Sequence, residues 1–241
     1  MIMIVMRDYL IRLAIRHEGR FFKIRKALEE QEEISDEIPL QNAITVFDED
    51  YPPELLELKY PPYVLFYRGD PDLLKGRKVA VVGSRDCSEY GELCTRSIVR
   101  ALRNDFTVVS GMARGIDSVA HKNALRTIGV LGNGVDVIYP EVNRKLYERM
   151  AEEQLLISEY PASTACRREN FPFRNRIIAA LSEAVIVPEA RIRSGSMITV
   201  RHALDLGRDI YAVPHRLTDV NGSGCNRLLQ LGASMILIDY Q

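Results

Sequence analysis

The sequence lacks a strong excess of charge of either sign. Its 32 lysines and arginines nearly cancel its 33 aspartates and glutamates, which leaves a formal net charge of -1 over 241 residues. A strongly basic chain would indicate a nucleic-acid partner by composition alone, and this chain gives no such indication. Any DNA site must therefore be a local basic patch on a nearly neutral protein.

Paired cysteines, metal-ligand spacing and long hydrophobic runs are also missing. The four cysteines form no CxxC pair and the four histidines show no ligand spacing, so we expect neither a metal site nor a disulfide framework. The apolar start, Met1 to Met6, is interrupted at Arg7 and is too short for a signal-peptide core or a membrane span. We therefore expect a cytoplasmic protein with reduced thiols, no cofactor and no membrane partner.

What is present is a pattern of alternating strands and helices. Residues 1–38 show the apolar spacing of short helices, and an acidic run before Pro39 indicates a boundary, so we divide the chain into a reduced helical N-terminal region, 1–38, and a main domain, 39–241. The main domain predicts an α/β fold: an extended Rossmann-like, doubly wound, mostly parallel sheet with helices on both faces. Expected strands are 64–67, 79–82, 107–109, 128–131, 155–157, 185–187, 210–213 and 235–238, and expected helices include 89–102, 116–125, 143–152, 175–181 and 197–206.

Glycine, small hydroxyl residues and arginine follow four of the expected strands. Ligands of open α/β sheets bind beyond the carboxyl ends of the strands, so these segments should share one rim. Glycine allows a phosphate to approach closely, a helix N-terminus attracts it, and arginine donates several hydrogen bonds to its oxygens. Any one segment could be only a tight turn, but four on one rim favour a binding site. The candidates are Gly83, Ser84, Arg85, Gly111, Arg114, Gly115, Gly132, Gly134, Ser194, Gly195 and Ser196.

Residues 167–176 form the densest basic stretch of the chain, with two phenylalanines interleaved among four arginines. This mixture suits a single strand, whose backbone needs cations and whose bases need flat apolar faces. The alternative is that Phe171 and Phe173 anchor the next helix in the core, which we expect of one of them. Pro172 should hold Phe171 extended, with its ring toward the rim. The candidates here are Arg167, Arg168, Phe171, Arg174, Asn175 and Arg176.

A catalytic constellation is not evident. The sequence has no nucleophile elbow, kinase string or P-loop. Asp117 and Asp136 could act as acid or base, but each lies where capping of a helix is the ordinary role, and His121 should pack between a helix and the sheet. We therefore expect a protein that is not an enzyme.

An ordered set of strings resembles the core of the DNA-processing protein A (DprA/Smf) family. The strings are ITV (44–46), VAVVGSR (79–85), SGMARGID (110–117), HKNAL (121–125), VLGNGVDVIYP (130–140), FPFRNRIIAALS (171–182), SGSMIT (194–199) and GCNRLLQLGA (224–233). Each string alone is weakly specific. Together, their order and spacing match the family across about four-fifths of the chain, which is a specific signal.

The resemblance implies a homodimer that binds single-stranded DNA without sequence preference and loads a RecA-type recombinase during natural transformation. By the motif match, the DNA pocket would hold Gly83, Ser84, Arg85, Gly111, Arg114 and residues 168–171. Three features depart from the family pattern. Pro188 precedes the acidic residue after the sixth strand, His215 follows Pro214 where glycine is usual, and the chain ends at Gln241, where many relatives continue into a winged-helix domain.

The alternative function is a nucleotide-binding sensor or a nucleotide phosphoribohydrolase, which would use the same rim for one nucleotide. Those hydrolases carry a PGGxGT loop with a downstream glutamate, which this sequence lacks. A pure interaction protein that keeps only the recombinase contact is a further alternative. The presence of Arg85, Arg114 and Arg168 argues against it.

Overall fold

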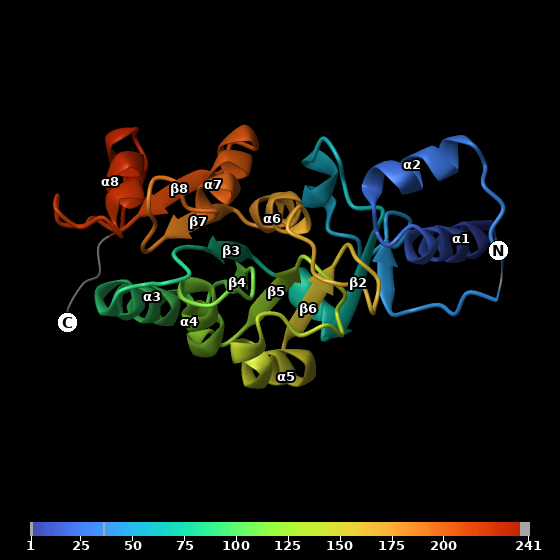
Figure 1. The fold of residues 1–241 in the computed structure, drawn as a ribbon, viewed down its shortest axis with the longest axis horizontal. Coiled ribbons are helices and arrows are strands. Elements are labelled where there is room, and N and C mark those ends of the chain that lie inside the picture. Colours follow the sequence, from blue (N-terminus) through green and yellow to red (C-terminus); the bar gives the residue numbers. More distant parts are fainter. Residues whose placement is uncertain (1, 36, 237–241) are drawn as a thin grey trace.

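A computed structural model describes residues 2–35 and 37–236, and within them the strands form one nine-stranded sheet (Figure 1). Its order is β1-β2-β6-β5-β4-β3-β7-β8-β9. β2 pairs antiparallel with both of its neighbours, β1 and β6, and the remaining neighbours are parallel, which confirms the predicted mostly parallel sheet. The strands are β1 (Ala43–Thr45), β2 (Val64–Gly69), β3 (Lys78–Val81), β4 (Thr107–Ser110), β5 (Thr127–Leu131), β6 (Leu155–Ser158), β7 (Ala184–Val187), β8 (Asp209–Ala212) and β9 (Ser234–Met235).

Helices cover both faces of this sheet. In Figure 1, α6, α7 and α8 lie above it, and α3, α4 and α5 lie below. The α-helices are α1 (Ile2–Arg16), α2 (Phe21–Glu29), α3 (Glu89–Leu102), α4 (Ile116–Asn123), α5 (Arg144–Glu153), α6 (Asn170–Ala180), α7 (Ser196–Asp205) and α8 (Ser223–Gln230), and short 3-10 turns are η1 (Pro53–Glu57), η2 (Pro71–Leu74) and η3 (Glu141–Asn143). The predicted doubly wound arrangement is therefore confirmed.

The central strands are buried along their whole length, as their apolar runs predict. Every residue of β3, β4, β5 and β6 is buried. One apolar cluster fills the space under α6, α7 and α8, and a second fills the space between the sheet and α3 and α4. At the start of α3, Ser88 accepts a hydrogen bond from the backbone N–H of Gly91, which satisfies a donor that the helix leaves unpaired.

The path of the chain reverses between β3 and β7. From β3 the chain builds outward through β4, β5 and β6, and then returns through α6 to place β7 on the other side of β3. Crevices form at such a reversal, beyond the carboxyl ends of the two strands. The segments that follow β3 and β7 are therefore expected to face each other across a crevice, close to the start of α6.

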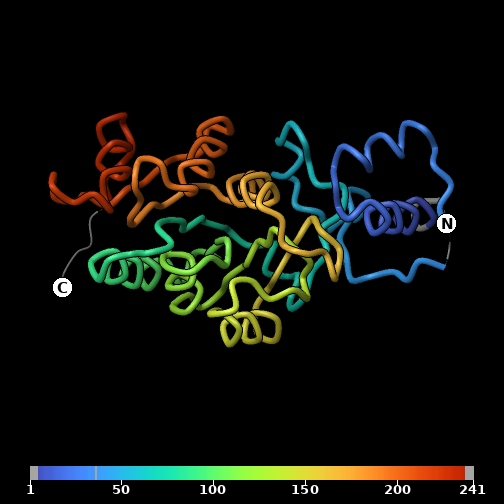
Figure 2. The backbone as a smooth tube through the Cα atoms, viewed as in Figure 1, coloured from blue at the N-terminus to red at the C-terminus, as the bar shows by residue number. Residues whose placement is uncertain are grey.

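The N-terminal helices lie at the opposite end of the molecule from α8 (Figure 2). Their apolar face packs against the antiparallel edge of the sheet: Leu10, Ile11 and Ile24 share one cluster with Val64 and Phe66 of β2. The helices of the predicted region 1–38 are therefore joined to the main sheet by a common core, and the boundary at residue 38 stays a prediction.

Two details differ from the sequence expectations, and part of one expected strand is not tested. The short strand β1 was not expected, and the end of the last expected strand, residues 237–238, lies outside the described residues. Helix α6 begins at Asn170 rather than at Asn175, so Phe171 is helical. The expectation that Pro172 holds Phe171 in an extended conformation is therefore wrong. Proline fits in the first turn of a helix because the N–H it lacks would have no partner there.

Candidate nucleic-acid interface

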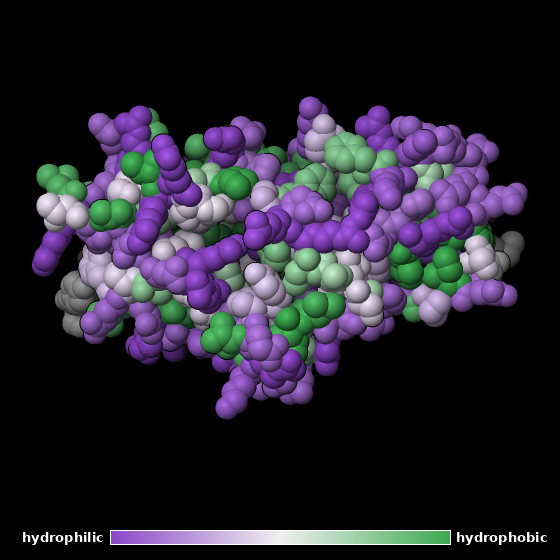
Figure 3. Space-filling view, in the orientation of Figure 1, coloured by the Kyte–Doolittle hydropathy of each residue, from purple (hydrophilic) through white to green (hydrophobic). Residues whose placement is uncertain are grey.

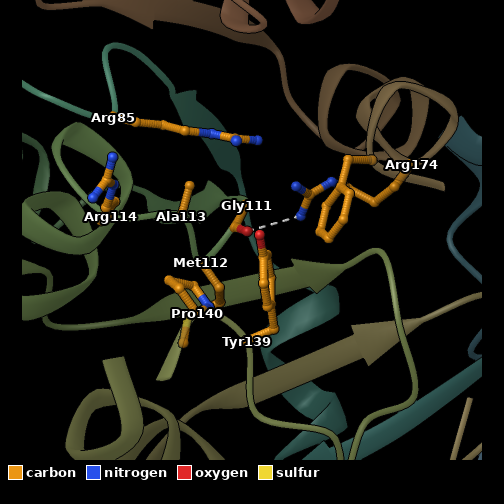
Figure 4. Close-up of a pocket in the computed structure, with 9 residues that line it drawn as sticks. Arg85, Gly111, Met112, Ala113, Arg114, Tyr139, Pro140 and Arg174 are labelled. Carbon is orange, nitrogen blue, oxygen red and sulfur yellow. Dashed lines mark hydrogen bonds between the residues drawn. The ribbon is translucent and has the colours of Figure 1, made fainter. Parts of the chain in front are cut away.

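A cavity of about 730 Å³ opens at the reversal between β3 and β7. Its walls come from the segment after β3, the loop after β4, the start of α6 and the segment between β7 and α7, which are distant in sequence. Of the predicted site residues, the cavity brings together Gly83, Ser84, Arg85, Arg168, Phe171, Arg174, Asn175, Ser194, Gly195 and Ser196. An adjoining recess adds Gly111 and Arg114 (Figure 4).

Arginine side chains give the cavity its positive charge. Arg85, Arg168 and Arg193 line it and are exposed, and within residues 2–35 and 37–236 none of the three forms an ion pair or hydrogen bond. In Figure 4 the side chain of Arg85 extends across the recess toward Arg174. Unpaired, exposed guanidinium groups that line one cavity are suited to phosphate oxygens, to which each can donate several hydrogen bonds.

Arg114 is placed differently from Arg85. Its guanidinium lies 3.0 Å from the carboxylate of Asp86, and both side chains are exposed. The pair offsets two charges at the mouth of the cavity, because Asp86 also lines it. Arg114 is therefore available to a phosphate only in competition with Asp86.

Arg174 forms part of the floor rather than the rim. Its side chain is buried, and it donates hydrogen bonds to the backbone carbonyls of Val130 and, at 2.9 Å, Gly111 (Figure 4). Burial lowers the pKa of its guanidinium to about 10, and the nearby carboxylate of Asp117 works in the opposite sense. The group thus stays protonated at neutral pH and contributes a fixed positive charge beneath the cavity.

Asp117 organises the loop between β4 and α4. Its carboxylate accepts hydrogen bonds from the backbone N–H groups of Gly111 at 3.2 Å and Ala113 at 3.3 Å. The residue between them, Met112, has a left-handed backbone with φ of 58°, and Asn143 donates to its carbonyl. The N–H groups of Gly111 and Ala113 therefore already have a partner in Asp117. They are not free to donate to a phosphate, although the loop still shapes the site.

Two aromatic rings face the cavity. The ring centroids of Tyr139 and Phe171 lie 5.4 Å apart, with the ring planes tilted by 39°. Tyr139 is 45% exposed, and in Figure 4 its ring points toward Gly111. Sequence reasoning missed Tyr139, although it stands near the end of the VLGNGVDVIYP string. The pair offers flat apolar faces next to the unpaired arginines.

Three of the predicted glycines, Gly115, Gly132 and Gly134, do not line the cavity but allow the surrounding segments to pack closely. A Cβ on Gly132 would lie 2.9 Å from the ring of Phe171, so glycine makes room for that ring. A Cβ on Gly134 would lie 2.6 Å from the carbonyl oxygen of Pro161, and one on Gly115, whose φ is 75°, would lie 2.2 Å from that of Ser84. These three glycines permit close packing of segments around the site.

Two arginines of the basic stretch 167–176 are engaged elsewhere. Arg176 is buried and donates to the carboxylate of Glu159 at 2.7 Å, and its guanidinium lies 3.7 Å from the ring centroid of Phe173. Arg167 pairs with Glu18 at 3.0 Å. Neither lines the cavity in the described part of the chain, so the structure gives Arg176 a core role in place of the expected surface role.

The two departures from the family pattern within the described residues touch each other. Nε2 of His215 lies 2.9 Å from the carbonyl oxygen of Pro188, and Nδ1 lies 3.1 Å from the carboxylate of Asp219. This contact ties the end of β7 to the loop before α8. Arg191, on the cavity wall, donates to Asn221 in the same loop. The loop between β8 and α8 thus buttresses the cavity wall after β7.

The candidate acid–base residues are held in structural contacts. His121 is fully buried, and its Nδ1 lies 2.6 Å from the hydroxyl of Thr127. Burial lowers the pKa of His121 to about 3, so it is neutral at physiological pH. Desolvation raises the pKa of the Asp117 carboxyl, while Arg174 and the two amides act to lower it. Among the described residues, no three His, Cys, Asp or Glu side chains are grouped to hold a metal ion, and no helix is both long and apolar enough to cross a membrane.

Comparison with known proteins agrees with this architecture. Residues 42–240 match the family described as DNA recombination-mediator protein A. The chain is 42% identical over 221 residues to DNA processing protein DprA of Streptococcus pneumoniae, covering 90% of this chain and 77% of that one. It is 39% identical over 230 residues to Protein Smf of Escherichia coli, covering 93% and 62%. Across its curated relatives it spans between 47% and 77% of their lengths.

Solved structures show the same likeness. The structure of DNA processing protein A from Streptococcus pneumoniae matches with a TM-score of 0.81 at 40% identity, over 89% of this chain and 78% of that one. DNA processing protein A from Helicobacter pylori, solved in connection with its single-stranded DNA binding mode, matches with a TM-score of 0.76 at 36% identity, over 82% and 92%. The fold, the ordered motifs and these matches together show that the chain belongs to the DNA recombination-mediator protein A family, the DprA/Smf family.

Proposed function

We propose that this protein binds single-stranded DNA, without sequence preference, in the cavity between β3 and β7. The observation that carries the proposal is the juxtaposition of the unpaired Arg85 and Arg168 with the rings of Phe171 and Tyr139 on one cavity. Guanidinium groups would hold phosphates, and the rings would stack on bases. Both contacts tolerate any base, since every nucleotide has a phosphate and every base has a π-face.

A single strand fits this arrangement better than a duplex does. In a duplex the bases are already stacked on one another, so their faces are closed to protein side chains. The rings of Tyr139 and Phe171 lie within a cavity rather than on a projecting helix or ribbon that could enter a groove. The single-stranded DNA binding mode of the Helicobacter pylori relative supports the same choice.

We also propose that binding occurs without chemical turnover. The two groups nearest to an acid–base role are engaged in the fold: Asp117 accepts from two loop amides, and the buried His121 contacts Thr127. A general base must reach the proton that it removes. His121 does not line the cavity, and Asp117, which does, is held by the two amides of its own loop. The expected result is that DNA, nucleotides and nucleoside monophosphates remain intact with the protein. Release of free base, lost in Arg85→Ala, would favour the hydrolase alternative.

The bound strand would then be passed to a RecA-type recombinase, in the cytoplasm, by a homodimer. The family's description as a recombination mediator supports this step. Leu204 in α7, Leu217 after β8 and Leu231 after α8 are exposed apolar side chains that a second copy of the chain would cover if it docked there. Sedimentation velocity would test the dimer, and strand-exchange assays with a RecA-type protein would test loading.

The direct test of the DNA proposal is a competition measured by fluorescence anisotropy. A labelled mixed-sequence oligonucleotide of about 20 nucleotides is displaced by unlabelled single strand, by duplex of equal length and by mononucleotides. We expect the single strand to compete best and the mononucleotides least. Arg168→Ala should weaken binding, and Arg100→Ala, which removes an exposed arginine that lies in the last turn of α3 and does not line the cavity, should not. Equal competition by duplex, or stronger competition by mononucleotides, would overturn the proposal.

A further inference from the structure

A cluster of four aromatic rings lies outside the cavity, where α2 meets the chain before β2. The ring centroids of Phe21 and Tyr63 are 4.9 Å apart and nearly parallel, and those of Phe21 and Tyr60 are 5.4 Å apart. Phe22 packs edge-on against Phe21 at 5.3 Å and against Tyr60 at 5.1 Å. The cluster is therefore a rigid aromatic platform built from two distant segments.

The outer part of this platform is open to solvent. Phe21 is buried with 6% of its surface exposed, whereas Phe22 is 57% exposed and Tyr60 is half-buried. Phe21, Ile24 and Ala27 anchor α2 in the core, so the core does not require the ring of Phe22. An exposed phenylalanine held in place by neighbouring rings presents a fixed apolar face, which is the geometry that single-strand binding proteins use for bases.

Cations accompany the exposed rings. The ammonium group of Lys59 lies 5.4 Å from the ring centroid of Tyr60, and Lys23, next to Phe22, is exposed. Among the described residues, neither lysine is in an ion pair, whereas the neighbouring Arg25 is paired with Glu29. Unpaired lysines beside exposed rings complement a polyanion that carries flat bases.

A network of charged side chains links the wall of the cavity to the platform. Arg168 lines the cavity, and the next residue back, Arg167, bonds to Glu18 at 3.0 Å. Glu18 also pairs at 3.2 Å with Arg20, which immediately precedes α2 and lies two residues before Phe22. On the face shown in Figure 3, hydrophilic side chains form a band across the molecule toward the N-terminal helices. A strand leaving the cavity past Arg168 would pass this network, in which Glu18 offsets part of the charge of Arg167 and Arg20, before it reaches the exposed rings.

We propose that Phe22 and Tyr60, with Lys23 and Lys59, form a second stacking site for the same single strand after it leaves the cavity. The inference rests on the proposed function and assigns the N-terminal helices a part in it. The cavity would bind the first nucleotides, and the platform would extend the footprint. A short oligonucleotide would fill the cavity alone, and a longer one would reach both sites.

The test is anisotropy with fluorescein-labelled oligothymidines of about 6 and about 20 nucleotides. We expect Phe22→Ala to weaken binding of the longer strand by roughly five-fold or more and to leave the shorter one unchanged. Phe22→Trp should restore the affinity for the longer strand. Lys59→Gln should flatten the salt dependence of the longer strand only. Phe47→Ala removes another exposed ring, in the loop beside the Arg7–Asp48 ion pair, and should change neither affinity.

The outcomes separate the two proposals. If Phe171→Ala weakens both lengths and Phe22→Ala weakens neither, the cavity binds DNA and the second site is wrong. If Phe22→Ala weakens both lengths equally, with an unchanged melting temperature, the two sites are not arranged in series and the inference also fails. If neither variant alters binding, the proposed function itself is wrong.

Discussion

Arg176 and Glu159 form an ion pair in the interior of the protein, with 2.7 Å between guanidinium and carboxylate and with side chains only 4% and 3% exposed. The same guanidinium covers the ring of Phe173 and donates to the carbonyl oxygen of Tyr60. The pair thus joins α6 to the segment after β6 and to the chain before β2. Burial raises the pKa of the Glu159 carboxyl, and Arg176 acts to lower it.

Arg176→Ala should therefore destabilise the fold rather than remove a DNA contact. Breaking one partner of a buried ion pair leaves the other charge uncompensated, at a cost of about 3–5 kcal/mol. Urea denaturation would measure the loss. The control is Arg168→Ala, which removes an exposed arginine from the same basic stretch. It should change the free energy of unfolding by less than about 0.5 kcal/mol. Equal stability of the two variants would show that the buried pair contributes nothing.

Arg85→Ala should flatten the salt dependence of DNA binding. Each phosphate contact with a single strand contributes about 0.7 to the slope of log affinity against log salt concentration, and Arg85 is an unpaired cation on the cavity wall. Titration at several salt concentrations would give the slope. An unchanged slope would mean that Arg85 does not contact a phosphate.

Asp86→Asn should strengthen DNA binding. The substitution removes a negative charge from the cavity wall and releases Arg114, 3.0 Å away, to meet a phosphate. We expect tighter binding at low salt and a slope steeper by about 0.7. If binding weakens instead, the Asp86–Arg114 pair is needed to shape the site.

Gly132→Ala should weaken DNA binding through Phe171. The added Cβ would lie 2.9 Å from the ring of Phe171, so the ring must move from its place beside Tyr139. Gly195→Ala is the control, because Gly195 lines the cavity but its added Cβ would meet nothing within 4 Å. Affinities and melting temperatures of both variants would be compared. Equal affinities would show that the position of the Phe171 ring does not matter.

His121 should make the fold less stable as the pH falls. Its pKa is about 3 in the folded protein, because burial and the charges of Arg149 and Arg174 disfavour the protonated ring, against about 6.5 in the unfolded chain. Below pH 6.5 the unfolded state therefore binds a proton that the folded state does not. The penalty for keeping His121 neutral is absent above pH 6.5. Below that pH it lowers the free energy of unfolding by about 1.4 kcal/mol per pH unit, down to pH 3.

The raised pKa values of Asp117 and Glu159 act in the opposite direction, because their folded state takes up protons first. The measurement is therefore the difference in unfolding free energy between the protein and His121→Gln, taken from pH 7 to pH 4. We expect the parent protein to lose stability relative to His121→Gln as the pH falls. A difference that does not change with pH would contradict a neutral, buried His121.

The sequence predicted the sheet well because its strands are near-continuous apolar runs between helical patterns. The expected helix 89–102 coincides with α3, whose cap at Ser88 and apolar face fix both ends. The strand β1 was not predicted because three residues, 43–45, are too few to show a periodic pattern. α6 was placed five residues late because Pro172 suggests a break, although proline is tolerated in a first helical turn.

The site was predictable in its segments but not in the direction of each side chain. Arg168 and Arg176 belong to one basic stretch, yet one lines the cavity and the other pairs with Glu159 in the core. That division depends on a partner 17 residues away in the sequence, which no local pattern reveals. Tyr139 was missed because its role depends on its position opposite Phe171, across a gap that only the folded chain closes.

The most direct test of the central claim uses the absence of tryptophan from the chain. Phe171→Trp would place a single indole at the proposed stacking position, and its fluorescence reports on stacking by a base. We expect saturable quenching by single-stranded DNA of mixed sequence, with the same midpoint as anisotropy, and little quenching by duplex at equal concentration. Binding detected by anisotropy without any change in tryptophan emission would contradict the account, because the strand would then lie away from Phe171.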